Sequence, residues 1–289
     1  MIASEHVPIA GSRLTMATTV FLLAMFSADI ATAQHEHGSP SVATPKAGGW
    51  TSYPTLTINA GRSPQQPIRV SAEGAQFSTL LLQSPSQPDV AQLTSETGKW
   101  SIDRSAAGAG GHLWAVATAS ADMQRVRASS YLFLPMKHQV PTEMLMRSRD
   151  GLEIIPLRLP EHGGIREGST WKYLIRHNDV ALAGTDVVLE TAGKTREIFK
   201  TDSSGIAAIR FPRDFSPEKL TGENPMSTKQ EFVLAVQHAD GGMKHLSTFN
   251  HHYLPDRMRE RSLFGGIGAL AFGMVLAAPL LRRKGKKNA

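Results

Sequence analysis

Five histidines are the residues of this chain best placed to do chemistry: His35 and His37 near its beginning, and His238, His245 and His251 towards its end. Imidazole nitrogens favour divalent transition metals such as Ni²⁺ and Cu²⁺. The chain has no cysteine, so any metal site must use histidine, carboxylate, methionine or backbone groups. These histidines are therefore the candidate metal ligands.

The first pair would lie beside a free amine if the chain were cleaved before Gln34. The amine, the imidazoles and the carboxylate of Glu36 would then fall within one flexible reach, which suits Ni²⁺ or Cu²⁺ in a square-planar or tetragonal arrangement. His35 would be second and His37 fourth, which is not the spacing that wraps such ions best, and cyclisation of Gln34 would weaken the amine. A solvated arm with incidental histidines is the alternative.

The other three histidines lie on a predicted β-hairpin. Its strands are expected at residues 232–238 and 243–251, joined by Ala-Asp-Gly-Gly at residues 239–242. Asp-Gly between apolar runs is the strongest short-range signal for a hairpin.

A register for this hairpin follows from its turn. Pairing Ala239 with Gly242 sets Val236 opposite His245, and the two-residue period of a strand then places four potential ligands on one face. They are His238, Met243, His245 and His251. The same face carries several large apolar residues of the hairpin. A core face with the histidines at its rim is therefore the alternative.

A tripeptide recurs in the chain: Met-Lys-His occupies residues 136–138 and again residues 243–245. Thioether together with imidazole favours Cu(I), so a copper carrier is an alternative metal function. Methionine is also a common flexible filler of core gaps.

The carboxyl end predicts a membrane anchor. Residues 262–281 contain no charge, and twenty helical residues span about 30 Å, the thickness of the hydrocarbon core of a bilayer. Five cations follow within the basic tail, residues 282–289. Because cationic flanks stay in the cytoplasm, we expect a single-pass protein with its carboxyl end inside.

The amino end predicts a signal peptide over residues 1–33. Arg13 precedes an apolar run at residues 16–26, and Ala31-Thr32-Ala33 is the small-x-small pattern that signal peptidase accepts. Residues 34–260 are then expected in the periplasm, anchored to the bacterial inner membrane.

The net charge of the chain comes mostly from its ends. The first 33 residues carry −1 and the segment from Arg261 onwards carries +6, so the formal net charge of +6 leaves about +1 for residues 34–260. Nucleic-acid binding would need a basic surface, which this balance does not indicate.

The central residues predict an all-β protein with two immunoglobulin-like antiparallel β-sandwich domains, at residues 50–135 and 150–255. A disordered, histidine-containing arm at residues 34–49 precedes them, and a proline-bearing connector at residues 136–149 joins them. Strands of the first domain are expected at residues 55–58, 67–71, 76–82, 99–102, 112–119 and 126–134.

The second domain has the clearest pattern. Its strands are expected at residues 171–176, 185–190, 197–201 and 206–211, with turns at Asn178-Asp179 and at residues 202–205, Asp-Ser-Ser-Gly.

The order of these parts resembles the DUF4198 family of bacterial periplasmic proteins over roughly a hundred residues. The parts are Leu-Glu-Ile-Ile-Pro-Leu at residues 152–157, a Gly-containing turn, a strand, a short polar turn followed by Ala-Leu-Ala-Gly, a strand, Lys-Thr-Asp-Ser-Ser-Gly at residues 200–205, and a closing strand. Some members are accessory components of nickel or cobalt uptake. The resemblance implies a membrane-anchored accessory protein that captures Ni²⁺ or Co²⁺ and hands it to inner-membrane transporter subunits.

No enzyme motif stands out. The sequence has no HExxH, no G-x-S-x-G elbow, no cysteine nucleophile and no phosphate-cradling loop between a strand and a helix. We therefore expect no catalytic activity and no organic cofactor. The alternative to metal capture is a non-catalytic module that binds protein or carbohydrate near the membrane.

Overall fold

The structure of the protein is a computed structural model. It describes residues 49–61, 63, 65–85, 87–104, 111–134, 140–160, 164–216 and 228–256, together with residues 268, 270, 272–274 and 276–278.

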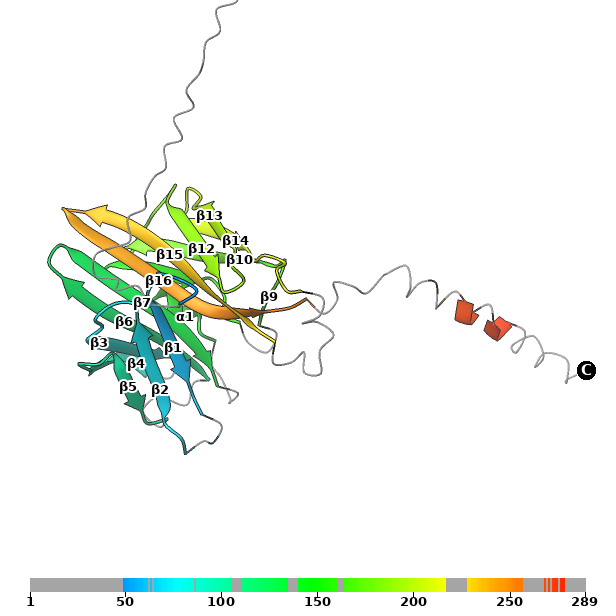
Figure 1. The fold of residues 1–289 in the computed structure, drawn as a ribbon, viewed down its shortest axis with the longest axis horizontal. Helices are drawn as coiled ribbons and strands as arrows, with labels where there is room; N and C mark the ends of the chain where they lie inside the picture. The colour runs from blue at the N-terminus through cyan, green and yellow to red at the C-terminus, as the bar shows by residue number, and fades with distance from the viewer. Residues whose placement is uncertain are drawn as a thin grey trace, which may run out of the picture. The chain divides into compact units, whose positions relative to one another are not determined.

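One large sheet organises the described residues (Figure 1). Eight of its nine strands follow one another across the sheet, and β9 (Ile165–Arg166) pairs with β16 beside this path. Most neighbours are antiparallel, but β16 runs parallel to β7 and to β9. The order across the sheet is β13 (Arg196–Lys200), β12 (Asp186–Thr191), β15 (Gln230–Asp240), β16 (Met243–Leu254), β7 (Gln124–Phe133), β6 (His112–Ala121), β3 (Thr79–Ser84) and β4 (Gln87–Thr94).

Two smaller sheets accompany it in the described part of the chain. The first has three strands: β1 (Thr55–Asn59), β2 (Ile68–Glu73) and β5 (Lys99–Ile102). The second has four strands: β8 (Leu152–Pro156), β10 (Thr170–His177), β11 (Val180–Ala181) and β14 (Ile206–Arg210).

Each small sheet shares a core with a different face of the large sheet. Along β6, Leu113, Ala115 and Ala117 belong to the core that contains the three-stranded sheet. Trp114 and Val116 belong to the core that contains the four-stranded sheet. Because successive side chains of a strand point to opposite faces, the large sheet is the middle of three β-layers.

The sequence predicted two sandwiches with separate cores on either side of residues 136–149, and that expectation is wrong. Pairing of β16 with β7 over residues 244–249 joins strands of both halves into one sheet. Within the predicted connector, α1 (Thr142–Met146) buries Met144 and Leu145 in the core. The pairing covers the edge that β7 would otherwise expose, which explains why the halves are joined.

The predicted strands of the second half are confirmed to within a few residues. Those expected at 171–176, 185–190, 197–201 and 206–211 correspond to β10, β12, β13 and β14. The hairpin strands are longer than expected, since β15 and β16 include residues 230–240 and 243–254.

The predicted signal peptide, the arm at residues 34–48 and the basic tail lie outside the described residues, as does much of the predicted membrane segment. Among the residues that are described, no helix is long and apolar enough to cross a membrane. The described part of 262–281 is helical, and its large apolar side chains are exposed: Leu270, Phe272, Met274 and Leu276.

Candidate functional site

His238 and His245 lie directly opposite one another on β15 and β16. Gly241 and Gly242 form the loop between these strands, with φ values of 55° and 81°. A tight hairpin turn of this kind needs positive φ at both positions, which glycine adopts without steric cost. The sequence predicted a loop of Asp240 and Gly241, so its register was wrong by two residues, although the faces were correct.

A third histidine joins this pair from the opposite layer. His177 ends β10, and its ring centroid lies 4.9 Å from that of His238 and 4.5 Å from that of His245. Its Nδ1 is 3.9 Å from a carboxylate oxygen of Asp240. We call His177, His238 and His245 the histidine cluster. Sequence reasoning missed His177, because only the stacking of two sheets brings it to the hairpin.

The surroundings of His177 and His245 favour neutral imidazoles. Burial is the main cause that lowers the pKa of His177 and of His245 below the usual histidine value. The neighbouring histidines and Arg125 lower both further, while Asp240 acts in the opposite direction. A neutral imidazole is the form that coordinates a metal ion.

In the described residues, no group of three or more histidine, aspartate or glutamate side chains is arranged as a metal site. The three rings of the cluster are close, but their nitrogens do not converge as they stand. Because a metal–nitrogen bond is about 2.0–2.1 Å long, rings on a shared ion have centroids about 5 Å apart. The observed separations of 4.9 Å and 4.5 Å between the ring centroids of the cluster are close to this value.

The remaining predicted ligands are not brought to this cluster. His35 and His37 lie outside the described residues. His251 is six residues from His245 along β16, which corresponds to about 20 Å. Its ring lies 4.3 Å from that of His252, and desolvation lowers its pKa to about 3. A shared face of a strand was thus not a shared site.

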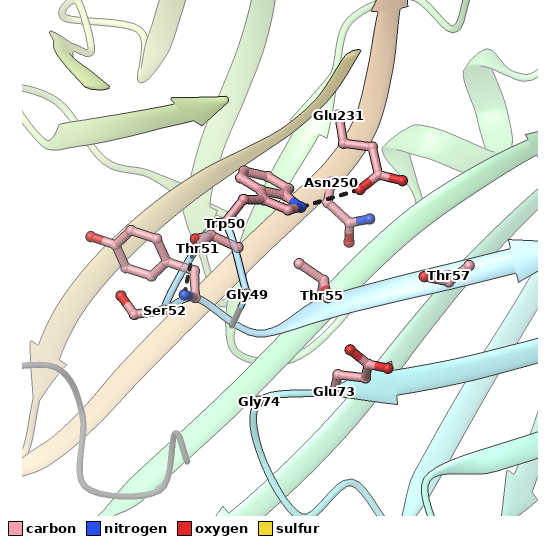
Figure 2. A pocket seen from close by; sticks show the side chains of 11 residues that line it. Gly49, Trp50, Thr51, Ser52, Thr55, Thr57, Glu73, Gly74, Glu231 and Asn250 are labelled. Atoms are coloured by element: carbon pink, nitrogen blue, oxygen red, sulfur yellow. Dashed lines mark hydrogen bonds between the residues drawn. The ribbon is translucent and has the colours of Figure 1, made fainter. Parts of the chain in front are cut away.

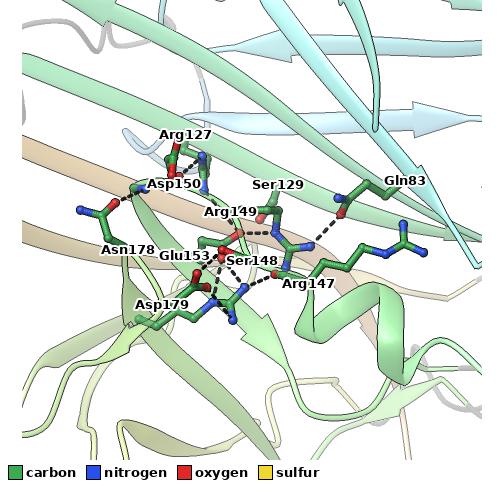
Figure 3. Close-up of polar contacts among 12 residues, drawn as sticks. Gln83, Arg127, Ser129, Arg147, Ser148, Arg149, Asp150, Glu153, Asn178 and Asp179 are labelled. Carbon is green, nitrogen blue, oxygen red and sulfur yellow. Dashed lines mark hydrogen bonds and ion pairs between the residues drawn. The ribbon is translucent and has the colours of Figure 1, made fainter. Parts of the chain in front are cut away.

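A network of buried charges surrounds Glu153 (Figure 3). Glu153, on β8, is 4% exposed and pairs with three arginines. Arg176 Nε donates to one carboxylate oxygen at 2.8 Å, while the other oxygen accepts from Arg149 and lies 3.4 Å from Arg127 Nη1. Burial lowers the pKa of Arg127, and Glu153 opposes this effect.

The same arginines hold the chain between α1 and β8. Arg149 Nη2 donates to the carbonyl of Leu145 at 2.7 Å, and its Nη1 donates to Gln83 Oε1 at 2.7 Å. Arg127 Nη2 donates to the carbonyl of Asp150. A cation at the carboxyl end of a helix satisfies carbonyls that have no partner within the helix. The network therefore fixes residues 147–152 against the large sheet.

A pocket lies where the described chain begins (Figure 2). Its volume is about 410 Å³, and its walls include the partly buried rings of Trp50 and Tyr53 with Glu73, Glu231 and Asn250. Trp50 Nε1 donates to Glu231 Oε2 at 3.2 Å. Aromatic faces beside carboxylates and an amide can bind a polar ligand.

Comparison with known proteins leaves the family open. No family model matches the chain, and no curated protein matches it. Among solved structures, it is similar to the fibronectin(III)-like modules of Clostridium thermocellum CbhA, at 11% identity over 71% of this chain and 97% of that one, with a TM-score of 0.23.

Two further similarities are of the same kind. A two-domain fibronectin type III segment of chicken tenascin is 9% identical over 69% of this chain and 97% of that one, with a TM-score of 0.22. The BSP domain of a biofilm-associated protein is 10% identical over 71% of this chain and 30% of that one, with a TM-score of 0.22. Such low scores carry no argument, so the layered β-sheet fold rests on the strand pairing described above.

Proposed function

We propose that this protein is a non-catalytic β-sandwich module, anchored on the periplasmic side of the bacterial inner membrane, that captures a transition-metal ion at the histidine cluster. It would then pass the ion to inner-membrane transporter subunits. The observation that carries this proposal is the approach of His177 to the facing pair His238 and His245, with centroids 4.5–4.9 Å apart.

The position of the cluster supports exchange of a bound ion. His177 and His245 are each 7% exposed, whereas His238 is only partly buried and Asp240 is exposed. The cluster lies at the loop end of the hairpin, so its open side is His238 and Asp240. An ion held there could enter and leave without opening a core.

The choice of metal follows from ligand type and from the DUF4198 resemblance. Three imidazoles without thiolate suit Ni²⁺, Co²⁺ and Cu²⁺. The resemblance places nickel or cobalt first, and copper is second. His35 and His37, which lie outside the described residues, would add two imidazoles that could deliver an ion to the cluster.

The membrane anchor is supported by the sequence pattern at residues 262–281 and by the exposed apolar side chains of its described helical residues, such as Phe272 and Met274. Exposed apolar surface of this kind marks a site of contact with a membrane or another protein.

Calorimetric titration of the full-length protein in mild detergent with Ni²⁺, Co²⁺, Cu²⁺ and Zn²⁺ tests the metal function. We expect one ion to bind with a dissociation constant in the micromolar range or tighter, about −8 kcal/mol. His177→Ala and His238→Ala should each weaken binding by about tenfold or more, because each removes a ligand.

His252→Ala is the matched control, since His252 lies on β16 but faces the opposite side of the sheet from His245. It should leave the affinity unchanged, and thermal melting of each apo variant separates loss of a ligand from loss of the fold. The double variant His35→Ala/His37→Ala tests the arm separately. The proposal fails if no ion binds below about 100 μM, a range of weak affinity, or if the cluster variants bind like the wild type.

A protein- or carbohydrate-binding module is the second candidate function, because the pocket at Trp50 presents aromatic rings and carboxylates together. Its test is binding to immobilised cell-wall polysaccharide. Trp50→Ala should abolish this binding, whereas His238→Ala should not affect it. If the two variants bound the immobilised polysaccharide equally well, the pocket at Trp50 would be excluded as the binding site.

A further inference from the structure

A second cavity lies on the large sheet beside the histidine cluster. Its volume is about 510 Å³, and residues of β3, β4, β6, β7 and β16 form its floor. Residues 149–152, which lead into β8, form one wall. This volume is in the range of pockets that bind small organic molecules. We call this cavity the arginine pocket.

Strand register explains which side chains meet there. Arg125 pairs with Ser120 on one side and with His245 on the other, and His245 pairs in turn with His238. Since directly paired residues share a face, these four form a row across β6, β7, β16 and β15. Arg127 lies two residues further along β7 and therefore belongs to the neighbouring row on the same face.

The charge of the pocket is positive. Arg125, Arg127 and Arg149 line it, against the carboxylate of Asp150 alone among the lining residues that the structure describes. Arg127, in the floor, and Arg149, in the wall, are held in place by Glu153 and by backbone carbonyls. Arg125 is exposed, and no hydrogen bond or ion pair joins it to another described residue.

The remaining lining is suited to an organic ligand rather than to a bare inorganic ion. Leu81 and Leu152 contribute apolar surface, while Thr79, Thr118 and Ser120 contribute hydroxyls. A guanidinium group can donate two parallel hydrogen bonds to one carboxylate. The positive charges of Arg127 and Arg149 add to this attraction, because their hydrogen bonds and ion pairs keep these side chains beside the pocket.

We propose that the arginine pocket binds a small organic anion that carries more than one carboxylate, with Arg125 as its direct partner. Arg127 and Arg149 supply fixed positive charge, and Leu81 and Leu152 contact the carbon skeleton. This site is separate from the proposed metal function, although His245 borders both. It does not require a bound metal ion.

Titration of the metal-free, full-length protein in detergent with citrate tests the site, in a chelator-treated buffer without other polycarboxylates. We expect saturable binding, and we expect Arg125→Gln to weaken it about tenfold or more, as the loss of hydrogen bonds to a charged group does. Arg69→Gln is the matched control, because Arg69 is an exposed strand residue in the three-stranded sheet. It should bind citrate like the wild type.

Three outcomes would overturn the proposal. The first is no citrate binding up to 10 mM, a concentration about 100-fold above the dissociation constant of a typical weak site. The second is equal citrate affinity of Arg125→Gln and wild type, and the third is inorganic phosphate that binds as tightly as citrate. The last would show an anion site without selectivity for a carbon skeleton. His238→Ala should retain citrate binding, which separates failure here from failure of the metal function.

Discussion

Glu153 illustrates how much a single side chain holds together at the residue scale. Its two oxygens pair with Arg127, Arg149 and Arg176 in a site where the carboxylate is 4% exposed. Without that carboxylate, three guanidinium groups would repel one another where water cannot screen them. Removal of one partner from a buried ion pair is far more costly than loss of an exposed pair.

We therefore expect Glu153→Gln to lower the free energy of unfolding by about 3 kcal/mol or more. Urea denaturation followed by circular dichroism measures this change. Glu197→Gln is the control, since Glu197 is exposed on β13 and should change stability by less than about 0.5 kcal/mol. Equal stability of the two variants would show that the arginines do not depend on Glu153.

Sequence alone predicted part of the histidine cluster, and the limit has a physical cause. His238 and His245 could be grouped because a hairpin pairs nearby residues. His177 could not, since its approach depends on the packing of two sheets. His251 was grouped wrongly because strand periodicity predicts the face of a side chain and says nothing of distance along the strand.

At the scale of elements, two turns show when a glycine is required. Gly205 and Gly241 both have positive φ, 73° and 55°. A Cβ at Gly205 would lie 2.9 Å from the carbonyl oxygen of Ile175 and 3.0 Å from the nitrogen of Leu182, whereas a Cβ at Gly241 would meet nothing within 4 Å. The two positions therefore share the backbone penalty and differ in steric clash.

We expect Gly241→Ala to cost about 1–2 kcal/mol of stability, the penalty for a left-handed residue with a Cβ. Gly205→Ala should cost about 1–3 kcal/mol more, because backbone atoms must move. Urea denaturation of both variants measures the difference. If the two variants lost a similar amount of stability, the loop after β11 would be able to move away from the new Cβ at no cost in free energy.

The sequence predicted most strands because alternating apolar residues and turn signals are local. It missed β4 (Gln87–Thr94), which contains Pro88 and Asp89, residues that are disfavoured in strands. β4 lies at the edge of the large sheet, where proline is tolerated. The parallel pairing of β16 with β7 was also missed, because it joins segments more than a hundred residues apart.

At the scale of the whole described β-structure, several contacts make the two halves one unit. Asn250, on β16, accepts a hydrogen bond from the nitrogen of Leu56 at 2.7 Å and donates to its carbonyl at 3.0 Å. Thr248 Oγ1 donates to the carbonyl of Pro54 at 2.8 Å. The three-stranded sheet is thus tied to a strand from the other end of the sequence, in addition to the shared large sheet.

Such coupling should make unfolding of the two halves cooperative. Leu80, on β3, is fully buried in the core with the three-stranded sheet, so Leu80→Ala should lower stability by about 2–5 kcal/mol. Hydrogen exchange followed by mass spectrometry should show that amides of β10 and β14, in the other half, lose protection by the same free energy. Ile198→Ala, at an exposed position of β13, should leave protection in both halves nearly unchanged. Wild-type protection of β10 and β14 in Leu80→Ala would instead mean that the halves unfold independently despite their common sheet.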